Sequence, residues 1–163
     1  MKMNNTRAVA AFTLVEVVLA LGITSFCLLP ISGLLVLALG SNQAGIEQTS
    51  ANSVLTAVVC DLQATPSAVT SGTAAISNQY SINIPTNGSA ATQTLYFNGD
   101  HQHVTTPASG RYRVTVNFVA PPSGGGARSA TDLLIKVSWP APVNPATATP
   151  SGLVQAFVAL DRN

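Results

Sequence analysis

The stretch FTLVEVVLALGITSFCLLPISGLLVLALG occupies residues 12–40, and its only charged residue is Glu16. About 20 apolar residues are enough for a helix to cross the ~30 Å hydrocarbon core of a bilayer. The sequence therefore predicts a membrane-spanning helix here. A carboxylate inside such a helix is costly, so we expect Glu16 to have a functional partner. Pro30 lacks an N–H donor and crowds the preceding turn, which predicts a kink between Thr24 and Pro30.

Residues 41–64 continue the helical period with a more polar composition. Apolar residues recur at spacings of three and four, with polar residues between them, and this pattern is typical of an amphipathic helix with one buried stripe. The residues of that stripe are Val54, Leu55, Val58, Val59 and Leu62. Pro66 disfavours helical geometry in the residue before it, so one long helix is predicted over residues 12–63.

Residues 65–163 read as a β-rich domain. Alternating or β-branched runs occupy residues 80–84, 92–97, 101–105, 111–118, 133–139 and 153–160. Asn98-Gly99 lies between the second and third runs, a signal typical of a hairpin. The predicted fold class is α+β, in which a long N-terminal helix packs its second half on a small, mostly antiparallel sheet of four or five strands.

The distribution of charge predicts a membrane orientation and excludes a nucleic-acid partner. Lys2 and Arg7 precede the apolar run, so the positive-inside rule places the N-terminus in the cytoplasm and residues 65–163 on the outer side of the membrane. After Gly40 the chain has five acidic and five basic residues and is formally neutral. Nucleic-acid binding usually needs a basic face, which this composition does not provide.

The stretch AFTLVEVVLAL, residues 11–21, resembles the N-terminal processing motif of type IV pilins and type II secretion pseudopilins. A basic leader, F-T-L-x-E and an uncharged apolar run together carry this resemblance, which covers about 30 residues. The runs RYRVTVNF and LLIKVSW resemble the C-terminal part of minor pseudopilins. They are also similar to a prepilin-like cassette protein family of verrucomicrobial genomes, its cassette protein B.

The resemblance implies that residues 1–11 are a leader. A prepilin peptidase would cut between Ala11 and Phe12 and methylate the new amine of Phe12. The family usually has Gly before the cut, and Ala11 keeps that residue small. Pro30 lies a few residues nearer the start than the kink proline of major pilins. The implied partners are the peptidase, other pilin or pseudopilin subunits and the inner membrane.

A physical role for Glu16 accompanies that resemblance. In a bundle of staggered helices, the Phe12 amine of one subunit would be a buried cation and Glu16 of its neighbour a buried anion. Together they offset a cost that each alone would carry, and they fix the register. The simpler interpretation is that the Glu16 carboxylate reaches the cytoplasmic interface of an unassembled anchor.

Other constellations predict no chemistry. His101 and His103 are spaced to share one strand face, but no further ligands have metal-binding spacing. No nucleophile motif or phosphate-binding loop is present, so we expect a structural subunit that is not an enzyme and has no cofactor, metal or small-molecule substrate. Cys27 and Cys60 are expected to be packing residues, with an intermolecular bridge through Cys60 as the alternative.

A second functional interpretation stays open at this point. Ala38-Leu39-Gly40 has small residues at the spacing that signal peptidase requires, so cleavage before Ser41 would release a secreted domain. The apolar run is much longer than the usual signal core of 7–15 residues, which favours the pilin-like interpretation. The chain could also be a binding domain for which the helix is only an anchor.

Overall fold

The structure is a computed structural model, and it describes residues 12–65, 75–85, 90–119 and 131–160. Two compact units divide between Ala44 and Gly45. The first contains the N-terminal part of the helix. The second, Gly45–Asn163, contains the C-terminal part of the helix and all the strands.

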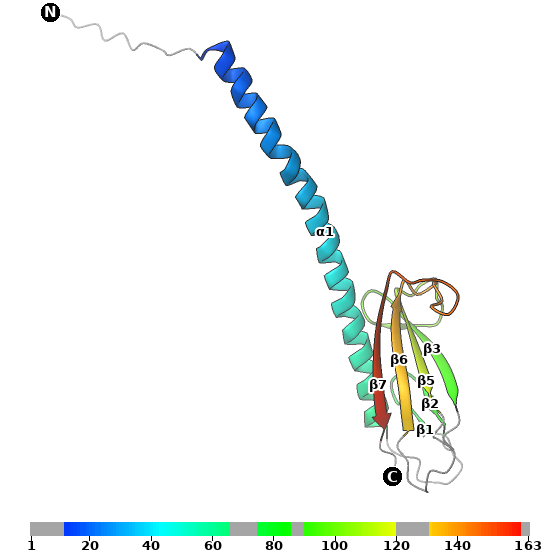
Figure 1. Cartoon of the computed structure of the whole chain (residues 1–163). Coiled ribbons are helices and arrows are strands. Elements are labelled where there is room, and N and C mark those ends of the chain that lie inside the picture. Colours follow the sequence, from blue (N-terminus) through cyan, green and yellow to red (C-terminus); the bar gives the residue numbers. More distant parts are fainter. Residues whose placement is uncertain (1–11, 66–74, 86–89, 120–130, 161–163) are drawn as a thin grey trace, which may run out of the picture. The chain divides into compact units, whose positions relative to one another are not determined.

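The described residues contain one helix, α1, which extends over Leu14–Ala64 (Figure 1). The predicted helix is therefore confirmed, with both ends within two residues of the prediction. The helix continues through Pro30, and the hydroxyls of Thr24 and Ser32 donate to the carbonyls of Ala20 and Leu28 at 2.7 and 2.9 Å. Such back-bonding often accompanies bent helices. The kink itself stays a prediction.

Five of the described strands form one antiparallel sheet in the order β4-β3-β5-β6-β7. Its strands are β3 (Ala91–Phe97), β4 (His103–Val104), β5 (Tyr112–Phe118), β6 (Thr131–Trp139) and β7 (Gly152–Leu160). Figure 1 labels four of them, β3, β5, β6 and β7. A separate two-stranded antiparallel pair consists of β1 (Ala75–Ile76) and β2 (Asn83–Ile84). The predicted α+β class and mostly antiparallel sheet are confirmed.

The core lies between residues 45–64 of the helix and one face of the sheet. Of the predicted stripe, Val54, Val58 and Leu62 are at most 1 % exposed, whereas Leu55 and Val59 are only partly buried. Ala51, which the prediction left out, is fully buried. Burial alternates along the whole of β5. Its even-numbered residues are buried, and its odd-numbered residues are partly exposed. The buried side chains that face the helix stripe from β5 and β6 are Tyr112, Val114, Val116, Phe118, Leu133, Ile135 and Val137.

Two strand predictions need correction. The run at residues 80–84 forms only a two-residue strand, because residues 78–80 turn and Ser81 has a positive φ of 55°. The hairpin at Asn98-Gly99 exists, but β4 has only two residues, since His101 lies in the turn with a φ of 61°. Strand β1 was not predicted. The glycine-rich loop at residues 120–129 lies outside the described residues.

Candidate functional site

The first candidate site is the surface of residues 12–40, every one of which is exposed. Large apolar side chains cover it, including Phe12 and Phe26 at 80 % exposure each. Within the described residues, one helix, Leu14–Ala64, is long and apolar enough to span a membrane. Water solvates such an apolar surface poorly, so we expect a bilayer, other helices or both to cover it.

Glu16 takes part in capping the helix that carries it. The hydroxyl of Thr13 accepts a bond from the Glu16 N–H at 3.3 Å and donates to Glu16 Oε2 at 3.5 Å. The spacing Thr-x-x-Glu is that of a capping box, and the sequence analysis missed it although the letters TLVE carry the signal. A cap is worth about 1 kcal/mol. Glu16 lies in the first turn of the helix, where a carboxylate costs less than the roughly 3 kcal/mol it costs at the centre of a bilayer. Capping accounts for the contact with Thr13 and leaves the negative charge of Glu16 within an otherwise uncharged stretch.

The structure describes only part of the predicted processing site. Phe12 precedes the helix and is exposed, while Ala11 lies outside the described residues. Glu16 lies four positions after Phe12, in the first turn of α1. Pro30 lies inside the same helix, among exposed apolar residues. The structure therefore brings Phe12, Glu16 and Pro30 onto one exposed apolar segment.

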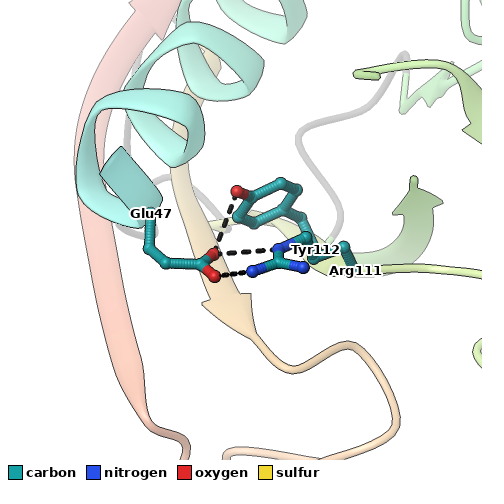
Figure 2. Close-up of polar contacts among 3 residues, drawn as sticks. All are labelled: Glu47, Arg111 and Tyr112. Carbon is teal, nitrogen blue, oxygen red and sulfur yellow. Dashed lines mark hydrogen bonds and ion pairs between the residues drawn. The ribbon is translucent and has the colours of Figure 1, made fainter. Parts of the chain in front are cut away.

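A second polar centre joins the helix to the sheet within Gly45–Asn163. Figure 2 shows the Glu47 carboxylate facing Arg111 and Tyr112. Glu47 Oε2 accepts from Arg111 Nε and from the Tyr112 hydroxyl, each at 3.1 Å, and Oε1 accepts from Arg111 Nη2 in an ion pair. The Arg111 side chain is 50 % exposed, but that of Glu47 is only 11 % exposed. This arrangement is a bidentate arginine–carboxylate pair with a buried tyrosine as third partner.

Asp61 is a second helix carboxylate bound by the β domain, near the C-terminal end of the helix. Its carboxylate accepts the backbone N–H groups of Gln79 and Tyr80 at 3.0 and 3.2 Å, so it fixes the turn before β2. Burial raises the pKa of the Tyr80 hydroxyl above its ordinary value of 10.0, and the charge of Asp61 raises it further. Glu47 and Asp61 thus attach both ends of the packed helical segment to the domain.

Sequence reasoning missed Glu47, Asp61 and their partners. A signal existed, because the buried helix positions Glu47, Ala51, Val54, Val58, Asp61 and Leu62 follow one helical stripe. Two acids on an apolar stripe indicate buried carboxylates that need donors. The donors themselves were not identifiable, since Arg111 follows Glu47 by 64 residues.

The two histidines do not share a strand face, which corrects that expectation. His101 lies in the turn near the ring of Tyr112, whereas His103 in β4 packs edge-on against Phe97, with ring centroids 5.8 Å apart. Among the described residues, no three His, Cys, Asp or Glu side chains gather as a metal site would require. Cys60 is exposed, so it is not the packing residue expected, and Cys27 is exposed as well.

Comparison of the chain with protein-family models, with curated proteins and with solved structures finds no match.

Proposed function

We propose that this protein is a minor pilin-like or minor pseudopilin-like structural subunit of a bacterial filament, of the type II secretion or type IV pilus kind. The observation that carries the proposal is the exposed apolar segment at residues 12–40, in which Glu16 is the single charge. An apolar helix of this kind can insert into a membrane and later pack against other helices.

Glu16 supplies the specificity in this proposal. After cleavage between Ala11 and Phe12, the methylated Phe12 amine of one subunit lies beside Glu16 of the next. Each charge offsets the cost of burying the other in an apolar bundle. A shift of one helix along its neighbour would separate the two charges, so the pair fixes the register of the helices. The role is structural, and the chain is a substrate of the processing peptidase.

Mass spectrometry of the mature protein from bacterial membranes tests the proposal. A first residue of methyl-Phe12 supports it. An N-terminus at Ser41 identifies a secreted domain instead, and retention of residues 1–11 identifies an unprocessed anchor. Either of these results contradicts the proposal.

The competing function is a secreted or membrane-anchored binding domain. One observation is compatible with it, because the compact unit Gly45–Asn163 begins after Ser41 and retains the Glu47 and Asp61 attachments. Under this alternative the apolar segment is only a signal or an anchor, and replacing Glu16 has no consequence for assembly.

A further inference from the structure

Strand β7 forms one edge of the sheet. It pairs with β6 over all nine residues, and within the described chain no strand pairs with its other side. Soluble proteins usually protect such edges with charges, prolines or bulges. Residues 152–160 contain none of the four charged residue types and no proline. Among the described residues, the edge strand therefore carries none of the charges or prolines that usually oppose strand addition.

The register identifies the main-chain groups on the free edge. Val119 donates to the carbonyl of Asp132 at 2.9 Å, so the even-numbered residues of β6 direct their main-chain groups to β5. The odd-numbered residues of β6 direct theirs to β7, where the register pairs them with even-numbered residues. The residues whose N–H and C=O groups point to the free edge are Leu153, Gln155, Phe157 and Ala159.

The side chains of these same residues lie on the sheet face opposite the helix. Leu153 is 46 % and Phe157 66 % exposed, and Phe157 lies directly across from Leu134 of β6. The charged residues of this face, Arg113, Asp132 and Lys136, belong to the central strands β5 and β6. The edge thus combines free main-chain donors and acceptors with an uncharged apolar surface.

We propose that the free edge of β7 is a strand-addition site for an extended, uncharged segment of another protein. That segment would run antiparallel to β7 and bond to the main chain of Leu153, Gln155, Phe157 and Ala159. Its apolar side chains, at alternate positions, would cover Leu153 and Phe157. β7 itself offers no opposite charge to a charged side chain of the added strand, and the charges of Asp132 and Lys136 lie one strand further in, across from Ala159 and Gln155. An uncharged partner therefore loses the least on burial at this edge.

A second copy of this chain is a poorer occupant. Antiparallel pairing of two β7 strands about a twofold axis reverses the direction of one helical segment 45–64 relative to the other. Two chains inserted from the same side of one membrane do not meet in this way. This exclusion depends on the proposed membrane insertion, whereas the free edge itself does not.

Gln155→Pro is the sharpest test of the site. The N–H of Gln155 faces the free edge, so proline removes a donor for the added strand and leaves the β6 ladder intact. Gln155→Thr is the matched control, because it changes the side chain and keeps the N–H. The probe is a fluorescein-labelled nine-residue peptide of alternating threonine and valine, added to the full-length protein in detergent and followed by fluorescence anisotropy.

We expect the wild type and Gln155→Thr to bind the peptide with similar affinity, and Gln155→Pro to bind about tenfold more weakly. A peptide with alternate residues N-methylated on its pairing edge should not bind. Equal binding by Gln155→Pro at unchanged melting temperature, or no binding by the wild type, overturns the proposal. Sedimentation showing dimers that Gln155→Pro abolishes, without peptide binding, assigns the edge to a second copy and also overturns it.

Discussion

Glu47 is the residue whose loss should most weaken the attachment of the helix to the sheet. Glu47→Ala leaves the buried Tyr112 hydroxyl without its acceptor, while the half-exposed Arg111 can turn to water. We expect a loss of roughly 1–3 kcal/mol in the free energy of unfolding. Urea unfolding of the full chain in detergent, followed by Trp139 fluorescence, measures it. Glu16→Ala is the matched control and should leave the midpoint unchanged.

Tyr80 reports the charge of Asp61. Since burial and then Asp61 raise the pKa of Tyr80, Asp61→Asn should lower that pKa toward its ordinary value. Ultraviolet absorbance of tyrosinate during an alkaline titration measures the change, with Tyr80→Phe to identify the signal. An unchanged titration in Asp61→Asn would mean that burial alone acts on Tyr80.

The same shift predicts a pH dependence of stability. Above pH 10 the unfolded state loses the Tyr80 proton while the folded state retains it, so the folded state loses stability as pH rises. Denaturant midpoints at successive alkaline pH values should fall less steeply in Tyr80→Phe than in the wild type. Equal slopes would contradict the prediction.

At the scale of elements, the start of β7 depends on a glycine. A Cβ on Gly152 would lie 2.0–2.6 Å from carbons of the Trp139 indole, directly across the β6–β7 ladder. Gly152→Ala therefore has to displace the indole, which we expect to cost about 1–3 kcal/mol and to change Trp139 fluorescence. Gly99→Ala is the control, because its Cβ would meet only Arg111 Cδ at 3.8 Å.

The elements themselves were largely predictable. The apolar run, the amphipathic stripe and the alternating runs of β5, β6 and β7 each repeat with the period of their own structure, so local pattern was enough. The presence of β1 and the short extent of β2 and β4 were not, because a strand of two residues carries no period. They are fixed by tertiary contacts such as Asp61 with Gln79 and Tyr80.

The functional sites also differ in how far local sequence predicts them. Glu16 was conspicuous because one charge interrupts an apolar run, whereas Glu47 was hidden among polar neighbours until the fold brought Arg111 to it. Local sequence can therefore indicate that a residue is anomalous. It cannot name a partner that lies on a distant strand or on another chain.

At the scale of the whole molecule, replacing each of the two glutamates of one helix should affect a different property: filament incorporation for Glu16 and domain stability for Glu47. Glu16 lies on the exposed apolar segment, and Glu47 lies in the core of the β domain. If the chain is a filament subunit, Glu16→Ala should permit membrane insertion and normal domain stability but reduce incorporation into filaments at least about tenfold, since one buried pair is lost per contact.

Glu47→Ala should do the reverse: it lowers domain stability while leaving the interface between apolar helices unchanged. Membrane fractionation, urea unfolding and quantification of sheared filaments measure the three properties in the same strains. Glu16→Asp, which keeps the charge on a shorter side chain, should restore part of the incorporation if charge pairing is the cause. Full incorporation of Glu16→Ala would contradict the pairing with a partner amine. Glu16 of the wild type would then have only the capping contact with Thr13 as its role.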